Sequence, residues 1–540
     1  MLKVKFIGAI QGVTGSCSWL WHTDSDTQFL VDCGIHQGPH HIEWLNRKAF
    51  PFSPSEIQYV LLTHAHLDHC GLIPRLVAEG FRGWVYCTQA TKEVAKELLA
   101  DAANISKLYS QDDVDGINWH VIDGGEFSWG RILKLSENLT ATFNCRSHVL
   151  GGCSVSVSWV KTPSDQQTNF ASIHFSGDLG CQTDDNPYLP LLKADHNPYP
   201  TTDYIVTEST YGNRRREAKC WRTRTSMLAD AVIRTVVQKG GKVLIPSFAF
   251  HRMQELIADL WTVASHQDDR LQSELPDGAR LKILCHSPLS NRLNRVYAEQ
   301  LTKVLGNGKA QYLSKELPER AQCTSSEIAG LYGSLYEGRA VNNGKLRFSA
   351  VSARPKGGAA GSFGSNLKTS DVILASSGMC DHGPSSEYLR ILRDDPRNTI
   401  ILTGFQASGS AGRELLECSA GEAEVLDLSS HYSGHGDQQR LLDNVFDLAG
   451  YSAGSKETAV FINHGESDSK ECLRREILTR AGNELQGDRR VNKVLIASDD
   501  WFDLNSGSYI QNQNQDQDQD QDQNSIRAEI ERLQALLETG

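Results

Sequence analysis

The stretch VLLTHAHLDHCG at residues 60–71 decides how the rest of the chain is interpreted. It starts with a short apolar run that is typical of a buried strand, and His64, His66, Asp68 and His69 then follow within six residues. Because side chains alternate along an extended segment, His64 and His66 project to one side. The chain then turns into a helix, so that Asp68 and His69 face a second position beside the first. Imidazole and carboxylate groups without a thiolate suit Zn²⁺ in a catalytic setting, and the stretch predicts a metal centre.

Length and composition narrow the class of protein. A chain of 540 residues, 39% hydrophobic and 22% charged, is long enough for two to four domains that each bury a core. No apolar run approaches the roughly 20 residues of a membrane-spanning helix. The N-terminal apolar stretch is broken by Gly12 and Gly15 before it reaches the length of a signal sequence. We therefore expect neither a membrane protein nor an exported one.

Cysteine usage and net charge add two further constraints. The thirteen cysteines are scattered and no C-x-x-C pair occurs, which favours free buried thiols in a reducing cytoplasm. The formal net charge of −12 disfavours indiscriminate binding of polyanions. A chain with this negative net charge can still bind a polyanion at a local cleft whose positive charge comes from metal ions. We expect a cytoplasmic protein.

The pattern of apolar runs divides the folded part of the chain into three segments. Residues 1–210 alternate short β-branched runs with glycine-rich turns and two helical patterns, which indicates a layered α/β domain. Residues 211–400 alternate helical patterns with fully apolar runs such as KVLIPSF, which is typical of a parallel sheet. Residues 401–505 repeat that second pattern.

The C-terminal segment has a different composition. Residues 506–524 include the run QNQNQDQDQDQDQN, which has no apolar side chain to build a core and predicts a disordered linker. Residues 525–540 predict a short amphipathic helix with Ile526, Ile530 and Leu533 on one face. A frayed end and self-association into a homo-oligomer are equally compatible with a helix of this length.

The motif in residues 60–71 resembles the signature of the metallo-β-lactamase fold, and the chain is similar to that superfamily from about residue 3 to residue 500. Further motifs follow in the same order: Asp32 in FLVDCGIHQG, His148 in CRSHVLGGC and Asp178 in HFSGDLG each stand where a strand is expected to end. The diiron oxidoreductase branch of the superfamily has glutamate at the position of His66, which disfavours a redox role.

The large insertion resembles that of the β-CASP nucleases. Glu208 in VTESTYGNR matches their motif A, His435 in LSSHYSGHGDQQ matches motif B, and His464 in FINHGES matches motif C. A histidine in motif C is similar to the RNA-processing members, whereas DNA-repair members usually carry valine. The resemblance is to bacterial and archaeal relatives of the mRNA 3′-end cleavage endonuclease.

This resemblance implies an α/β fold in which an αββα metallo-β-lactamase sandwich is interrupted by an inserted β-CASP domain with a parallel sheet. Residues 1–210 and 401–505 then form the two parts of the sandwich, and residues 211–400 form the insertion.

The resemblance also implies a site that holds two Zn²⁺ per chain. The metal ligands carried over from the family are His64, His66, Asp68, His69, His148, Asp178 and His464, with Asp178 shared by both ions and Asp32 orienting the metal-binding loop. In the mechanism that we expect, Asp68 and Asp178 orient a hydroxide, while His435 acts as general acid with Glu208 hydrogen-bonded to it. Arg413 and the weaker candidate Ser410 precede or begin a helix, where a phosphate of the substrate is favoured.

These features predict a zinc-dependent ribonuclease that processes or degrades RNA, in either endonucleolytic or 5′-exonucleolytic mode. A hydrolase of small esters or thioesters is the alternative from the same superfamily, and a DNA nuclease is the alternative within the same family. A non-catalytic RNA-binding subunit is disfavoured, because such members lose metal ligands and this chain has all of them. RNA is the expected partner, and no membrane contact is expected.

Overall fold

The computed structural model describes residues 1–38, 40–125, 127–161, 170–181, 191–195, 202–216, 221–266, 268–351, 360–418, 421–449, 457–483 and 491–510. Within these ranges, no helix combines the length and the apolar character that a membrane span requires. The predicted linker begins at residue 506, but β22 still pairs in a sheet at Ser508–Tyr509. The rest of that linker and the predicted terminal helix lie outside the described residues.

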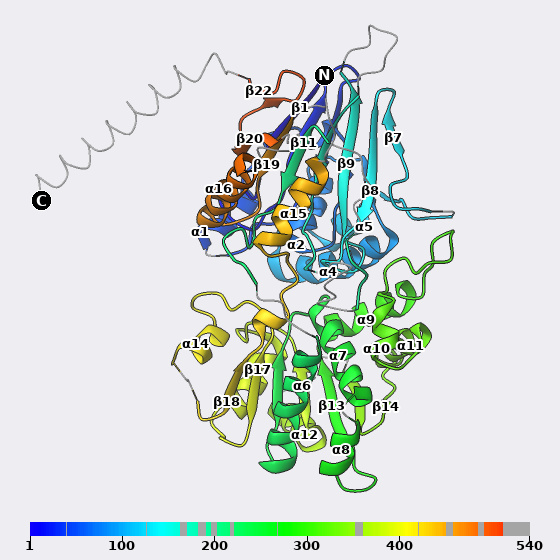
Figure 1. Ribbon diagram of the computed structural model, residues 1–540, viewed down its shortest axis with the longest axis vertical. Helices are drawn as coiled ribbons and strands as arrows, with labels where there is room; N and C mark the ends of the chain where they lie inside the picture. Colours follow the sequence, from blue (N-terminus) through cyan, green and yellow to red (C-terminus); the bar gives the residue numbers. More distant parts are fainter. Residues whose placement is uncertain are drawn as a thin grey trace, which may run out of the picture.

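Two sheets stack face to face in the upper half of the molecule (Figure 1). The first runs in the order β22-β21-β1-β2-β3-β4-β5-β6 and the second in the order β20-β19-β11-β10-β9-β8-β7. The first sheet consists of β1 (Leu2–Phe6), β2 (Ser18–His22), β3 (Thr27–Val31), β4 (Ile57–Leu61), β5 (Trp84–Cys87), β6 (Trp119–Val121), β21 (Phe502–Asp503) and β22. The second consists of β7 (Leu133–Ser136), β8 (Leu139–Cys145), β9 (Cys153–Val160), β10 (Phe170–Phe175), β11 (Tyr204–Thr207), β19 (Thr458–Ile462) and β20 (Val491–Ile496).

Apolar side chains fill the space between these two sheets. The alternating burial of β1, in which Leu2, Val4 and Phe6 point inward, is the period expected of a strand with one buried face. These side chains share one core with residues of the second sheet such as Trp159 and Phe461. Burial of these apolar groups is what holds the two layers together.

Helices cover the outer face of each sheet, which completes an αββα sandwich. Beside the first sheet lie α2 (Leu67–Cys70), α3 (Ile73–Ala78), α4 (Gln89–Ser106) and α5 (Gln111–Asp115). The connection between β3 and β4 holds α1 (His40–Glu43) and the short helical turns η1 (Trp44–Arg47) and η2 (Pro54–Glu56). Beside the second lie α15 (Gln438–Ala449) and α16 (Ser467–Asn483), which pack on Val460 and Ile462. The predicted sandwich is confirmed.

The lower half of the molecule is built on a third sheet with the order β14-β15-β13-β16-β12-β17-β18 (Figure 1). Its strands are β12 (Val243–Pro246), β13 (Leu281–His286), β14 (Val341–Asn343), β15 (Leu346–Val351), β16 (Val372–Ala375), β17 (Thr399–Leu402) and β18 (Glu424–Asp427). Apart from the antiparallel pair of β14 and β15, all the pairs are parallel. The predicted parallel-sheet domain is confirmed.

Helices cover both faces of the third sheet, as parallel strands require. One face carries α6 (Trp221–Val232), continued by the wider helical turn η3 (Ile233–Gln238), together with α7 (Arg252–His266), α8 (Asp268–Glu274), α9 (Pro288–Gln300), α10 (Glu316–Arg320) and α11 (Ser325–Tyr336). The other carries α12 (Ala360–Thr369), α13 (Gly383–Leu392) and α14 (Ala411–Cys418).

The third sheet extends past residue 400, where the sequence pattern placed the end of the inserted domain. Strands β17 and β18 pair in parallel from Thr399–Glu424 to Leu402–Asp427. The short turn η4 (Ser429–His431) follows before the chain returns to the sandwich through α15. Because the returning segment has the same alternation of helices and apolar strands as the insertion, composition alone does not mark where one sheet ends.

Candidate metal centre

The candidate residues gather because they leave the carboxyl ends of strands that run in the same direction. Strands β3 to β6 are parallel in the first sheet, as are β10, β11, β19 and β20 in the second. Parallel strands end at one edge of their sheet. Strand β8 runs in the same direction as β10, because both are antiparallel to β9. Residues that follow the ends of these strands are Asp32 (after β3), His64 (after β4), His148 (after β8), Asp178 (after β10), Glu208 (after β11) and His464 (after β19).

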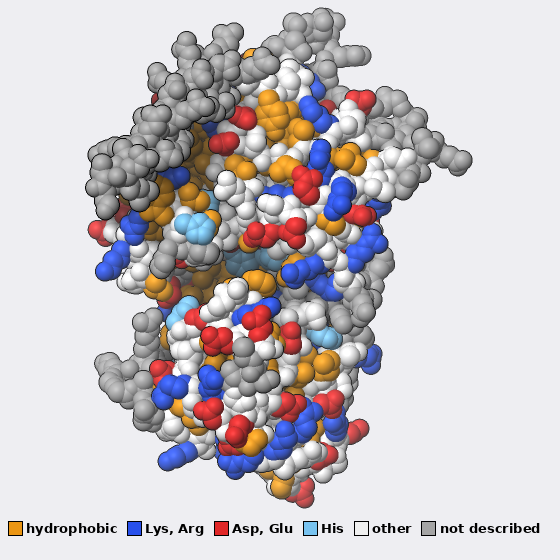
Figure 2. Space-filling view, turned by 90° about the vertical axis from the view of Figure 1, so that its left-hand side faces the viewer, with side chains coloured by type: hydrophobic (Ala, Val, Ile, Leu, Met, Phe, Trp, Pro, Cys, Tyr) orange, Lys and Arg blue, Asp and Glu red, His pale blue; other side chains and the backbone are white. Residues whose placement is uncertain are grey.

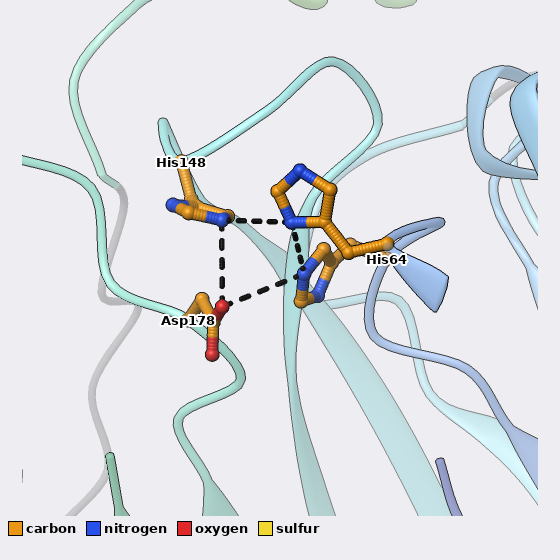
Figure 3. Close-up of side chains that lie close together, drawn as sticks. His64, His148 and Asp178 are labelled. Atoms are coloured by element: carbon orange, nitrogen blue, oxygen red, sulfur yellow. Dashed lines mark hydrogen bonds and ion pairs between the residues drawn. The ribbon is translucent and has the colours of Figure 1, made fainter. Parts of the chain in front are cut away.

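A first group of donor atoms converges from three loops. His66 Nδ1 lies 3.1 Å from His64 Nε2 and 3.1 Å from His148 Nε2. Asp178 Oδ2 lies 3.6 Å from His64 Nε2 and 3.4 Å from His148 Nε2. Figure 3 shows His64, His148 and Asp178 pointing toward one another. All four residues can hold one metal ion between them.

The spacing and protonation of this first group fit a divalent metal. Tetrahedral ligands about 2.0–2.1 Å from Zn²⁺ stand roughly 3.3 Å apart, which is close to the four separations above. Burial and neighbouring histidines lower the pKa of His64 and of His148 well below the usual range, and burial lowers the pKa of His66 to about 4. The three imidazoles are therefore neutral at pH 7, and the neutral ring is the form that binds a metal.

A second group of donor atoms adjoins the first. His69 Nε2 lies 3.1 Å from His464 Nε2 and 3.3 Å from Asp178 Oδ1, and His464 Nε2 lies 3.4 Å from Asp68 Oδ2. Burial raises the pKa of the Asp178 carboxyl, but His464 and His69 outweigh it and hold that pKa well below the usual range. Asp178 Oδ1 is buried and has no hydrogen-bond partner, which suits an oxygen that binds a cation.

Asp32 holds part of this second group in place. The Thr63 backbone N–H donates to Asp32 Oδ1 over 2.8 Å, and His69 Nδ1 lies 2.7 Å from Asp32 Oδ2. Asp32 is 3% exposed and has a positive φ of 62°, a conformation that aspartate tolerates better than most residues. The carboxylate thereby directs His69 Nε2 toward His464, which is the orienting arrangement seen around metal-binding histidines.

His435 and Glu208 form a pair beside the first group. His435 Nδ1 lies 3.1 Å from Glu208 Oε2, and the Leu179 backbone N–H donates to Glu208 Oε1 over 2.6 Å. Burial lowers the pKa of His435, but the Glu208 and Asp178 carboxylates outweigh it and raise that pKa to about 10. The imidazole is therefore cationic at neutral pH and can give up a proton.

The two residues expected to contact a phosphate lie at the start of α14, and that role stays a prediction. Arg413 lies in the first turn of α14, and its Nε donates to Glu417 Oε1 over 2.7 Å. The Ser410 hydroxyl donates to the Ala407 carbonyl and accepts from the Arg413 backbone N–H, so it caps the helix. Among the described residues, no ion pair joins Arg413 to the histidine groups.

Sequence reasoning missed the residues that support this site from the third sheet's domain. The Phe250 ring packs edge-on against His66 with centroids 5.2 Å apart. Tyr432, three residues before His435, donates to Asp259 over 2.7 Å, and Arg224 binds the same buried carboxylate. A run of ordinary apolar and charged residues carries no motif that could reveal such contacts.

An αββα sandwich with clustered histidines and carboxylates at the strand ends defines a metal-dependent hydrolase that binds divalent metal. A model of the Metallo-beta-lactamase superfamily matches residues 11–134, and a model of the Beta-Casp domain matches residues 253–415. The chain belongs to the β-CASP family of metallo-β-lactamase-fold proteins, as its motifs predicted.

Named relatives agree with this assignment. Ribonuclease TTHA0252 of Thermus thermophilus is 29% identical over 498 residues, which cover 90% of this chain and 97% of that protein. Transcription termination factor FttA of Methanocaldococcus jannaschii is 28% identical over 506 residues, covering 87% of this chain and 68% of that protein. The Lokiarchaeum FttA is 24% identical, covering 92% and 71% respectively.

Proposed function

We propose that the chain is a zinc-dependent ribonuclease that hydrolyses phosphodiester bonds of RNA. The observation that carries this proposal is the sharing of Asp178 between two adjacent groups of donor atoms, one through each carboxylate oxygen. Two metal ions a few ångströms apart are the arrangement that phosphodiester-cleaving enzymes use for in-line displacement. A relative named as a ribonuclease, similar along nearly its whole length, supports RNA as the substrate.

We assign the donor groups to two Zn²⁺ ions per chain. His64, His66 and His148 would hold one ion, Asp68, His69 and His464 would hold the other, and Asp178 would supply a carboxylate oxygen to each group. When bound, such ions acidify water to supply a nucleophile near neutral pH and offset the charge that grows on the phosphate oxygens. Histidine and carboxylate donors without thiolate fit this use of zinc.

The protein's own side chains would then handle protons and orientation. Asp68 and Asp178 accept hydrogen bonds from the attacking water and direct it toward phosphorus. His435, kept cationic by Glu208, donates its proton to the leaving 3′-oxygen. Because Glu208 also accepts from the Leu179 backbone N–H, its carboxylate has a defined position from which to hold His435.

A cleavage assay tests this proposal. Internally labelled single-stranded RNA and DNA of the same sequence are incubated with the protein, with and without a chelator. We expect the protein to cut RNA and spare DNA, and the chelator to abolish cutting. Product lengths then distinguish internal cleavage from removal of nucleotides at the 5′ end. Failure to cut RNA by protein shown to hold two zinc ions would overturn the ribonuclease proposal in favour of a small-ester hydrolase.

A variant pair tests the role of His435. His435→Ala should greatly reduce turnover while metal analysis still finds the wild-type zinc content. His120→Ala removes an exposed histidine on β6 and should change neither quantity. Loss of zinc in His435→Ala would make His435 a metal ligand and remove its assignment as general acid. A cytoplasmic location and a homo-oligomeric state stay predictions.

A further inference from the structure

Two phenylalanine side chains stand exposed at the carboxyl edge of the third sheet. Phe248 follows the end of β12, and Phe405 follows the end of the neighbouring strand β17. Phe248 is 38% exposed and Phe405 is 56% exposed. Single exposed apolar residues are common on proteins, so exposure alone says little. The position of this pair is what makes it informative, because ligands of open α/β sheets bind at the carboxyl ends of the strands.

Close contacts hold the Phe248 ring in one place. A methyl group on Gly404 would lie 2.8 Å from the Phe248 ring, and one on Gly378 would lie 3.1 Å from it. The absence of side chains at both glycines is therefore what lets the two loops close on the ring. The buried Gln406 amide donates to the Gly378 carbonyl over 3.1 Å and to the Gly404 carbonyl over 3.0 Å. The loops after β12, β16 and β17 thus form one continuous surface. We call it the aromatic shelf and define it by Phe248 and Phe405.

The aromatic shelf lies next to the metal centre. Phe250, whose ring packs against His66, is only two residues after Phe248, so the two Cα atoms are at most about 7 Å apart. Phe248 therefore lies close to the cluster of histidines that includes His66. Figure 2 shows one face of the molecule, hollowed between the two halves, with histidine and apolar side chains in the hollow.

We propose that the aromatic shelf binds unpaired bases of the substrate strand by stacking, one or two nucleotides from the bond that is cut. This inference rests on the proposed ribonuclease function. A phosphodiester held at the metal centre carries its neighbouring bases to within a few ångströms of the protein surface. The exposed rings of Phe248 and Phe405 supply apolar contacts that a charged or hydroxyl side chain could not, and aromatic stacking is how proteins hold single-stranded bases.

Two properties of the substrate follow from the aromatic shelf. Every base presents a π-face, so stacking tolerates any sequence and gives little preference among bases. A base inside a duplex has both faces covered by its neighbours and is not free to stack on protein. We therefore expect the protein to select single-stranded segments of RNA with weak sequence preference.

Binding of labelled oligonucleotides tests the aromatic shelf without depending on cleavage. Fluorescence anisotropy with the zinc-loaded protein gives the dissociation constant of an octauridylate with hydrolysis-resistant phosphorothioate linkages and of an octamer with the same ribose-phosphorothioate backbone but no bases. The wild type should bind the base-containing strand more tightly. Loss of one stacked base weakens binding by about 5- to 150-fold, so Phe405→Leu should move the dissociation constant of octauridylate by that factor. Its affinity for the abasic strand should not change.

Matched variants separate stacking from a structural effect. Phe405→Tyr retains the ring and should bind as the wild type does. Phe170→Leu removes a ring that is 54% exposed at the start of β10, roughly 17 Å along that strand from its other end, and should have no effect on binding. Phe248→Leu should weaken binding of octauridylate as Phe405→Leu does. Circular dichroism shows whether the variant protein still folds.

The possible results distinguish the two proposals. Octauridylate affinity that is unchanged in both leucine variants, or equal affinity of the wild type for the two strands, would overturn the aromatic shelf while leaving ribonuclease activity intact. Normal stacking behaviour combined with no cutting of RNA would keep the shelf as a base-binding surface and remove the ribonuclease proposal. Equal affinity for single-stranded and duplex RNA would also count against the shelf.

Discussion

The hydrogen bonds of Asp32 predict that its replacement by asparagine weakens metal binding without removing a ligand. Thr63 donates its backbone N–H and its hydroxyl to the Asp32 carboxylate at 2.8 and 3.0 Å, and His69 Nδ1 lies 2.7 Å from the other oxygen. Asparagine keeps the shape and tolerates the positive φ, but it places an NH₂ group against one of these donors. His69 then loses either its orientation or its preferred tautomer.

The size of the effect follows from this geometry. Removing an orienting partner of a metal-binding histidine lowers metal affinity about 10- to 100-fold, which corresponds to about 1.4–2.7 kcal/mol. A buried donor left without an acceptor costs a further 1–3 kcal/mol or so of folding stability. Titration with a competing chromophoric chelator measures the affinity for Zn²⁺, and urea unfolding measures the stability.

Asp123 offers a matched control for Asp32. It is a similarly buried carboxylate, and it accepts from the Gln89 backbone N–H over 2.6 Å and from the Tyr312 hydroxyl over 2.9 Å. Asp123→Asn should therefore lower the urea midpoint but leave zinc affinity at the wild-type value. If Asp32→Asn binds zinc as tightly as the wild type, or if both variants weaken binding equally, the orienting role of Asp32 is refuted.

Two further predictions concern charge pairs. Glu208→Gln should lower the pKa of His435, because the imidazolium loses a neighbouring carboxylate. The alkaline limb of the pH–rate profile, where the cationic acid loses its proton, should therefore move to lower pH. An alkaline limb at the wild-type pH would argue against the pair of His435 and Glu208. Asp259→Asn should reduce the free energy of unfolding by about 3–5 kcal/mol, because the buried Arg224 loses the carboxylate that balances its charge. Glu417→Gln, which breaks the exposed pair with Arg413, should change the free energy of unfolding by less than about 0.5 kcal/mol, and equal urea midpoints for the two variants would contradict this reasoning.

The sequence by itself determined the chemistry of the site. His64, His66, Asp68 and His69 lie within six residues, so one strand-to-helix turn brings all four side chains to the same end of β4. The order of the remaining motifs identified the family, and the alternation of apolar runs predicted both the sandwich and the parallel sheet. These features are local or periodic, so they survive without knowledge of how distant segments meet.

The sequence pattern did not predict where the third sheet ends or which contacts its surface residues make. The third sheet continues to Asp427, beyond the boundary expected at residue 400, because parallel strands of either domain have the same apolar composition. Arg413 lies where the pattern predicted, in the first turn of a helix, and its guanidinium pairs there with the exposed Glu417, so its contact with a phosphate stays a prediction. Which partner a surface arginine chooses depends on neighbours that only the folded chain supplies.

Only the tertiary structure decided how the groups combine. His69 and His464 are 395 residues apart in the chain, and their ring nitrogens approach to 3.1 Å because β4 and β19 end at the same edge of the sandwich. The approach of His66 Nδ1 to His64 and His148, the position of Asp178 between the two groups of donor atoms and the aromatic shelf arise in the same way. Contacts between strand ends depend on sheet order and register, which are properties of the whole fold.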